Sequence, residues 1–170
     1  MNEAPKSFAI EQERAEHRPS IETLLDRAFG PGRYARAAER LREGNRPVAA
    51  LCLVAVEGTS LRASVQLWPI LVGATPALLL GPLVVDPSHA GRGFGRGLMR
   101  AALDRAAERG HRLCLLVGDL PYYAKVGFVR VPRGRLVMPG PVDPDRLLVR
   151  KLVPGAFVDV SGAVAVPRQG

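Results

Sequence analysis

The segment Leu78–Gly97, with the sequence LLLGPLVVDPSHAGRGFGRG, constrains the fold of this chain more than any other stretch. It predicts an apolar strand, a short turn and a glycine-rich loop that runs directly into a helix. Glycine at every second position lets the backbone turn tightly and approach a ligand closely. The free N–H groups of the loop and the positive end of the helix dipole point at whatever lies there, which favours a phosphate or pyrophosphate. The alternating loop residues are Gly91, Arg92, Gly93, Phe94, Gly95, Arg96 and Gly97.

The helix after this loop has the most regular apolar pattern in the chain. We expect it over Gly95–Arg109, with apolar residues three and four apart on one face and charged residues opposite. Gly110 ends it, and the apolar run Leu113–Val117 predicts a buried strand. A strand, a helix and a strand in this order predict one right-handed parallel crossover over residues 78–117.

Before this unit, the pattern predicts a weak first strand and two helices. The strand is expected over Phe8–Glu13, and Ser20 is expected to cap a helix that runs to about Phe29. Gly30-Pro31-Gly32 ends that helix, and a second short helix is expected over Tyr34–Arg42.

Three apolar segments then predict strands. Val48–Val56 is almost continuously apolar, as in a central strand covered on both faces, whereas residues 61–68 alternate like a half-buried partner in a hairpin. Ala77–Val85 is interrupted by Gly81-Pro82. Because proline has no N–H to donate, this segment is either an edge strand or a strand whose ladder opens at a bulge.

The last third of the chain predicts fewer elements. A short helix is expected over Pro121–Val126 and a strand over Phe128–Val131. A loop rich in proline and glycine follows, and Leu147–Leu152 is expected to be the last strand. The tail from Val153 has a weak pattern and predicts no element.

Composition bounds the class of protein. A chain of 170 residues, 47% of them hydrophobic, fits a single domain over residues 1–170 and is not of a disordered type. It has no apolar run of membrane-spanning length, and its first residues do not resemble a secretory signal, so we expect a cytoplasmic protein without a membrane segment. The net charge of +8 reflects either a preference for arginine codons or attraction to an anionic ligand.

Cysteines and histidines predict no metal or redox chemistry. Cys52 and Cys114 lie in apolar runs and are expected to be buried free thiols. The three histidines are too scattered to form a metal site, so we expect none. No basic stripe interleaved with aromatic residues is present in the sequence, so we expect no nucleic-acid partner in spite of the charge.

Two stretches carry a resemblance to a known family. DPSHAGRGFGRGLM resembles the acetyl-CoA pyrophosphate loop of the GNAT superfamily of acyl-CoA-dependent N-acyltransferases, and HRLCLLVGDLPYYAKVGF resembles the strand and helix that follow it. Within the superfamily the chain is most similar to bacterial predicted acetyltransferases with a GD-x-x-YY-x-x-x-GF pattern. The resemblance implies an α+β fold with a mixed, mostly antiparallel sheet, splayed parallel central strands and helices on both faces.

The resemblance also implies a site for acetyl-CoA as co-substrate. The family loop is usually Q/R-x-x-G-x-G/A, and alignment by its glycines puts Ala90 where the family has Gln or Arg. A register shifted to residues 92–97 satisfies the pattern literally, but the first alignment keeps the usual distance from the strand end. It implies that the pyrophosphate lies at residues 90–96, with Arg92 and Arg96 within reach of phosphate oxygens. The pantetheine arm would bond to the unpaired backbone of Leu83, Val84 and Val85.

For the chemistry, the resemblance implies direct attack of an amine on the thioester. Tyr123, four residues before Gly127-Phe128, matches the general acid of the family, and a backbone N–H near Leu83–Val84 is the candidate oxyanion donor. The preceding strand has no carboxylate until Asp86, so Asp86 and Asp119 are the candidate bases. The structural alternative is that each caps the turn or helix that follows it.

The sequence therefore leaves two functions open. One is an N-acetyltransferase that transfers the acetyl group of acetyl-CoA to a primary amine of a small molecule or protein. The other is a catalytically weak acyl-CoA-binding regulatory module, which Ala90 and the missing strand carboxylate favour and Tyr123 opposes. The sequence does not identify the acceptor, and the resemblance allows a homodimer.

Overall fold

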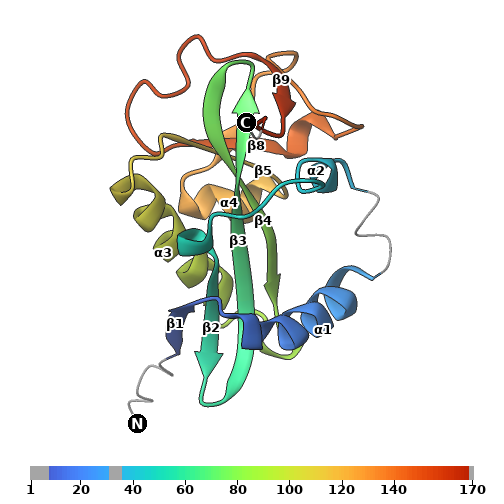
Figure 1. Cartoon of the computed structure of the whole chain (residues 1–170), viewed down its shortest axis with the longest axis vertical. Helices are drawn as coiled ribbons and strands as arrows, with labels where there is room; N and C mark the ends of the chain where they lie inside the picture. The colour runs from blue at the N-terminus through green and yellow to red at the C-terminus, as the bar shows by residue number, and fades with distance from the viewer. Residues whose placement is uncertain (1–7, 31–35, 169–170) are drawn as a thin grey trace.

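A computed structural model of the chain describes residues 8–30 and 36–168 (Figure 1). The strands of these residues form one mixed nine-stranded sheet in the order β1-β2-β3-β4-β5-β8-β6, with β9 joined to β3 and β7. Only the β4–β5 and β7–β9 pairs of this described sheet are parallel, so the expected fold class is confirmed. The strands are β1 (Ala9–Gln12), β2 (Leu53–Glu57), β3 (Ser60–Val72), β4 (Thr75–Val85), β5 (Leu113–Val117), β6 (Val129–Arg130), β7 (Leu136–Val137), β8 (Leu147–Lys151) and β9 (Gly162–Ala165).

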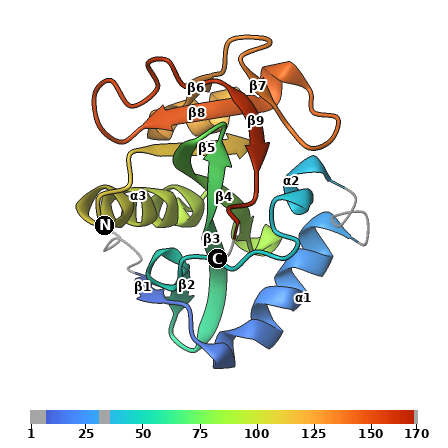
Figure 2. The same cartoon turned by 45° about the horizontal axis from the view of Figure 1, so that its top comes forward.

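Helices cover both faces of the sheet (Figure 2). Leu53 and Ala55 of β2 pack in the cluster that contains α3 and the end of α4, whereas Val54 between them packs against α1. Neighbouring residues of a strand point to opposite faces, so α3 and α1 lie on opposite sides of the sheet. None of the helices in the described ranges is long and apolar enough to cross a membrane. The helices and 3₁₀ turns are η1 (Ala15–His17), α1 (Arg18–Phe29), α2 (Ala37–Arg40), η3 (Ala49–Leu51), η4 (Pro87–His89), α3 (Phe94–Glu108), α4 (Leu120–Tyr123), η5 (Ala124–Val126) and η6 (Pro144–Arg146).

The long β3–β4 hairpin forms the middle of the sheet (Figure 1). Val65 pairs with Leu83 and Leu67 pairs with Leu80, so Gln66 alone faces both Gly81 and Pro82. The interruption in β4 is therefore a bulge in a central strand, and the edge-strand alternative is wrong.

The middle of the polar phase of β3 is buried, which corrects the expectation of a half-exposed strand. Ser64 and Gln66 are 2% and 7% exposed. Ser64 lies beside Val54, whose side chain packs against Ile21 and Leu24 of α1. Because α1 covers this face, alternation in β3 separates two buried surfaces rather than a core from solvent.

The predicted parallel crossover is confirmed. β4 and β5 pair in parallel on the two sides of α3, which starts one residue before the predicted start and ends one residue before the predicted end. Every apolar residue of its predicted inner face is buried, and Cys52 and Cys114 are buried free thiols as expected.

Two N-terminal predictions need correction. The first long helix begins at Arg18 rather than after Ser20, because Pro19 occupies its first turn, where the fixed φ of proline suits a helix start. The second helix is limited to Ala37–Arg40, and the part predicted at residues 34–35 lies outside the described residues. The apolar run from Val48 begins with the turn η3, so that β2 starts only at Leu53.

The C-terminal region contains two strands that the sequence does not predict. β9 pairs with the end of β3 at Leu71 and Val72, and β7 pairs with β9. Leu147–Lys151 is the expected strand β8 but is not the last one. The predicted helix after β5 is present as α4 and η5 and ends at Gly127 as expected.

Candidate functional site

The parallel strands β4 and β5 separate at one end of their pairing. They pair only at Leu78–Cys114 and Leu79–Leu115, within strands that the structure describes completely. Beyond Leu79 the strand β4 continues to Val85, hydrogen-bonded to β3 but not to β5. The bulge at Gly81-Pro82 lies directly after the last parallel pair. The predicted break in pairing is therefore confirmed at the predicted place.

A cavity of about 930 Å³ opens at this gap. On one face of the sheet it is lined by α1 and by residues 36–47, and on the other by the end of β5 and by α4. Residues 80–83 of β4 line the gap between these walls. The cavity therefore reaches the separated strands from both faces.

The glycine loop lies at the start of α3. Gly91 and Gly93 have φ angles of +80° and +86°, which L side chains rarely adopt, and a Cβ on either would meet no atom within 4 Å. Gly93 is the N-cap of α3, and among the described residues no side-chain capping hydrogen bond is present at this helix start. The loop therefore presents an open, glycine-lined surface at a positive helix end, as predicted from the sequence.

Two side chains of the loop, Arg92 and Phe94, already have partners within the protein. Arg92 forms an ion pair with Glu57 at 2.5 Å, and its guanidinium lies 4.9 Å from the centre of the Phe94 ring. Hydrogen bonding to Arg92 lowers the pKa of Glu57 to about 2. Phe94 itself is 1% exposed and packs against Phe8, so its side chain belongs to the core. Arg96 and Ala90 are exposed.

Tyr122 and Tyr123 both line the cavity but point in different directions. The Tyr122 hydroxyl lies over Gly95 in the first turn of α3, so closely that a Cβ there would overlap it. The Tyr123 ring covers Gly118 and meets the Phe128 ring edge-on. Burial raises the pKa of Tyr123 to about 12, with smaller contributions from Tyr122 and Asp119. Tyr123 is therefore a neutral hydroxyl group at physiological pH.

The two predicted bases have different surroundings. Asp86 is 8% exposed and does not line the cavity. It accepts a hydrogen bond of 3.0 Å from the Ser88 N–H and lies 3.4 Å from Arg62. The Ser88 hydrogen bond is the main cause that lowers the pKa of Asp86. The turn-capping alternative is thus confirmed for Asp86.

Asp119 lines the cavity, yet its side chain is 78% exposed and pairs with Arg146 at 3.3 Å. It holds the N-cap position of α4, where its backbone carbonyl accepts from Tyr122 and Tyr123. Its carboxylate makes no capping bond, so the helix-capping alternative is wrong for this side chain.

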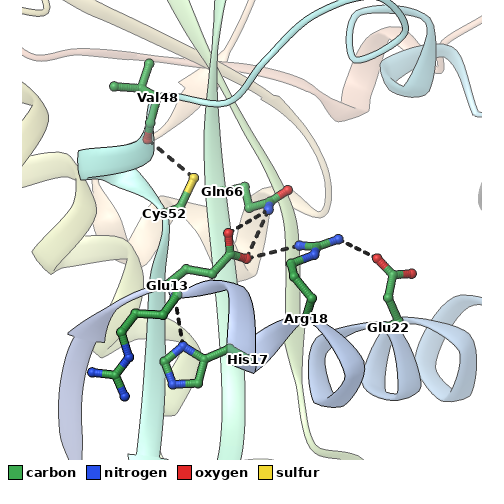
Figure 3. Close-up of polar contacts among 8 residues, drawn as sticks. Glu13, His17, Arg18, Glu22, Val48, Cys52 and Gln66 are labelled. Atoms are coloured by element: carbon green, nitrogen blue, oxygen red, sulfur yellow. Dashed lines mark hydrogen bonds and ion pairs between the residues drawn. The ribbon is translucent and has the colours of Figure 1, made fainter.

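The structure places a carboxylate at the cavity that the sequence does not single out. Figure 3 shows Glu13, just after β1, beside Gln66 of β3 and Arg18 of α1. The sequence pattern puts Gln66 on the polar phase of residues 61–68 and Glu13 at the end of a weak strand, so no local pattern indicates that the two residues meet. Trp68 of β3 also lines the cavity.

A family model and a relative of known name both relate this chain to acetyltransferases. The model of the acetyltransferase (GNAT) family matches residues 13–128. A mycothiol acetyltransferase of Frankia alni is 32% identical over 89% of this chain, which spans only 53% of that protein.

Two solved structures are similar over most of the chain. The GNAT family N-acetyltransferase YhbS of Escherichia coli, in complex with CoA, has a TM-score of 0.82 and 26% identity, and the match covers 100% of this chain and 97% of that one. A GNAT family acetyltransferase of Brucella melitensis, in complex with acetyl-CoA, has a TM-score of 0.62 and 27% identity over 89% of this chain and 99% of that one. The family match extends over the separated parallel strands and the glycine loop, and the chain belongs to the acetyltransferase (GNAT) family.

Proposed function

We propose that this protein transfers the acetyl group of acetyl-CoA to a primary amine by direct attack within a ternary complex. The observation that supports this most is the gap between β4 and β5 next to an uncapped, glycine-lined helix start. The relatives solved with CoA or acetyl-CoA share this fold, which supports the same co-substrate here.

The gap suits an extended polar ligand. The backbone of β4 beyond Leu79 has an edge without a strand partner, so the amides of a pantetheine arm can bond to Leu83, Val84 and Val85 as an added strand. Leu83 and Val85 line the cavity, whereas the Val84 side chain packs with α1. In this proposal the N–H groups of Gly91, Gly93 and Gly95 hold the pyrophosphate, because Ala90 offers no polar side chain.

In the reaction, a backbone N–H near Leu83–Val84 stabilises the oxyanion. Tyr123 donates its hydroxyl hydrogen to the thiolate as the C–S bond breaks. Its pKa of about 12 keeps this donor protonated throughout the neutral range. This donor is therefore less acidic than an ordinary tyrosine, whose pKa is about 10.

Thermal unfolding with acetyl-CoA, CoA and ATP tests the co-substrate site. At about 100 times its Kd a ligand adds about 2.7 kcal/mol to the free energy of unfolding. For a domain of this size we expect a shift of about 5–10 °C with acetyl-CoA and little with ATP. No shift at millimolar acetyl-CoA would contradict the proposal. Turnover is then measured with n-butylamine, 2-phenylethylamine, spermidine and the acceptor of the Frankia enzyme.

Tyr123→Phe tests the chemistry. We expect an unchanged thermal shift with acetyl-CoA and a turnover lower by about 100-fold, the scale of general acid catalysis. The matched control is Tyr122→Phe, which removes the neighbouring hydroxyl and is expected to keep turnover within a few-fold of the wild type. Equal turnover in Tyr123→Phe and wild type would remove Tyr123 from the mechanism.

A regulatory acyl-CoA-binding module is the second candidate function. Two observations favour it: Ala90 supplies no phosphate ligand, and Arg92 is paired with Glu57. This function predicts a thermal shift with acetyl-CoA but no turnover of any amine in the panel.

A further inference from the structure

We propose that Glu13 is the base of this reaction: its carboxylate binds the ammonium group of the acceptor and takes its proton before attack. This inference rests on the proposed function. It assigns the role that the sequence leaves between Asp86 and Asp119.

Glu13 lies in the cavity at the gap between β4 and β5. Its side chain is only 12% exposed and lines the same cavity as Gly81, Pro82 and Leu83 of the gap. Its partner Gln66 is the β3 residue that faces Gly81 and Pro82 across the bulge. The carboxylate is thus held by the residue opposite the point where β4 leaves β5.

The contacts of Glu13 fix the orientation of its carboxylate but leave some of its hydrogen-bond acceptor sites unoccupied. Gln66 Nε2 lies 3.1 Å from Oε1 and 3.3 Å from Oε2, and Arg18 Nη1 donates to Oε1 at 3.1 Å (Figure 3). A carboxylate has about four acceptor sites, so Oε2 has room for a further donor. An ammonium group is such a donor.

The charge around Glu13 favours a cation. Arg18 also pairs with Glu22, so its positive charge is divided between two carboxylates. Gln66, which holds both oxygens of Glu13, is neutral. Among the described residues, the groups that face Glu13 are Arg18 with Glu22 beyond it from α1, Gln66 from β3, and Cys52 before β2, whose pKa of about 12 keeps it an uncharged thiol.

The other carboxylates that line the cavity are less suited. Asp119 is exposed at 78% and paired with Arg146. Glu39 pairs with Arg42 at 2.9 Å, and Glu43 pairs with Arg40 at 2.9 Å. Asp143 accepts the Asp145 N–H in the turn η6. Glu22 is 42% exposed and pairs with Arg18. Each of these carboxylates is tied to a neighbour four or fewer residues away or is open to solvent.

With Glu13 as the base, every proton and electron pair of the acetyl transfer is accounted for. A primary amine with a pKa of about 10 is mostly ammonium at neutral pH. The ammonium nitrogen gives one proton to Glu13, and its lone pair forms the C–N bond to the thioester carbonyl carbon. The C–S electron pair leaves on sulfur, which takes a proton from Tyr123, and the second nitrogen proton restores Tyr123. Glu13 releases its proton to solvent, so that ammonium and acetyl-CoA give N-acetylamine, CoA thiol and H⁺.

Glu13→Gln tests this assignment, since the amide keeps the shape and an acceptor for Gln66 but loses the charge. We expect the thermal shift with acetyl-CoA to be unchanged. For the amine of the panel with the fastest turnover, kcat/KM at pH 7 is expected to fall about 100-fold or more. This deficit should shrink by about tenfold per pH unit up to pH 9, because the variant depends on the neutral amine, whose fraction rises with pH.

Three further variants serve as controls. Glu16→Gln makes the same change at an exposed carboxylate paired with Arg14 and is expected to leave kcat/KM and its pH profile unchanged. Glu13→Asp keeps the charge and is expected to retain more activity than Glu13→Gln. If Asp119→Asn instead shows the pH-dependent loss, or if Glu13→Gln does not, the assignment is overturned. It is also overturned if both Glu13 variants lose the acetyl-CoA shift, since the residue then acts on folding.

A binding measurement separates this assignment from the proposed function. Spermidine is titrated by calorimetry into the CoA-bound protein, where Glu13→Gln is expected to weaken binding by about tenfold or more. Equal binding to wild type and variant overturns the role of Glu13, while turnover by the wild type leaves the proposed function intact. A wild type that shows no shift with acetyl-CoA contradicts the proposed function, and the assignment fails with it.

Discussion

Arg92 and Glu57 join two turns that are 35 positions apart in the sequence. Glu57 ends β2, and Arg92 lies in the glycine loop, so the pair connects the β2–β3 turn to the predicted phosphate site. Arg62 also reaches Glu57, at 3.3 Å, and continues to Asp86 at 3.4 Å. These ion pairs connect the glycine loop to the β2–β3 turn, so Arg92 already has a carboxylate partner before any pyrophosphate binds.

The pair predicts a specific acid response. Because the folded-state pKa of Glu57 is lowered from 4.5 to about 2, its contribution to stability is complete above about pH 4.5 and is lost as the pH falls toward 2. We expect the thermal midpoint of Glu57→Gln to lack this part of the acid-induced decrease between pH 4.5 and 2. Arg92→Gln should remove the larger share of the same part, because Arg62 still contacts Glu57, and the double variant should remove no more than Glu57→Gln. Parallel curves for wild type and Glu57→Gln would contradict the pairing.

At the level of elements, α4 is fitted to its neighbours through two glycines. Gly95 in α3 lies under the Tyr122 hydroxyl, and Gly118 at the end of β5 lies under the Tyr123 ring. Neither glycine has a positive φ, so both positions are restricted by space rather than by backbone conformation. The direction of each tyrosine therefore depends on a missing side chain in another element.

Gly118→Ala tests this fit. A Cβ at this position would overlap Cε2 of Tyr123 and lie 2.9 Å from its Cδ2, so the ring must move. We expect turnover to fall by at least about tenfold, on the scale of a misplaced catalytic group, with the acetyl-CoA shift retained. Gly140→Ala is the matched control, because its Cβ would be 3.4 Å from the nearest atom, which is an ordinary contact. Unchanged turnover in Gly118→Ala would show that the ring position does not matter.

Some of these elements could be predicted from the sequence and others could not. The elements α3 and β5 and the glycine loop follow from local patterns, and the resemblance adds Tyr123 to them. β7 and β9 are too short for such a pattern, and they form only because β3 extends past β2 to pair with β9. Glu13 and Gln66 meet across 53 positions, so their contact depends on strand order and on α1 covering a polar strand face. No local spacing contains that information.

At the scale of the whole molecule, the reactivity of the two buried thiols can be used to follow global unfolding. Cys52, between η3 and β2, and Cys114, in β5, are 2% and 0% exposed. Burial raises the pKa of each thiol to about 12, so neither forms the reactive thiolate at ordinary pH.

We therefore expect the native protein to resist a thiol-directed reagent at pH 8, whereas both thiols react in denaturant. Slow labelling of the native state should require global opening, so saturating acetyl-CoA is expected to slow labelling of both residues by the same factor. Mass spectrometry after timed labelling measures each site. Rapid labelling of either cysteine in the native protein would contradict its burial.

The cavity is lined by segments that come from separate parts of the gene. Residues from the ranges 13–29, 36–47, 66–68, 117–123 and 141–146 line it together with residues from 80–85, which belong to the strand that leads into the glycine loop. In evolutionary terms, mutations in the first group reshape the cavity while the strand, loop and helix are inherited unchanged. Under the proposed function, a duplicated gene can acquire a new acceptor without rebuilding the acetyl-CoA site, so the choice of amine is expected to diverge faster than the choice of donor.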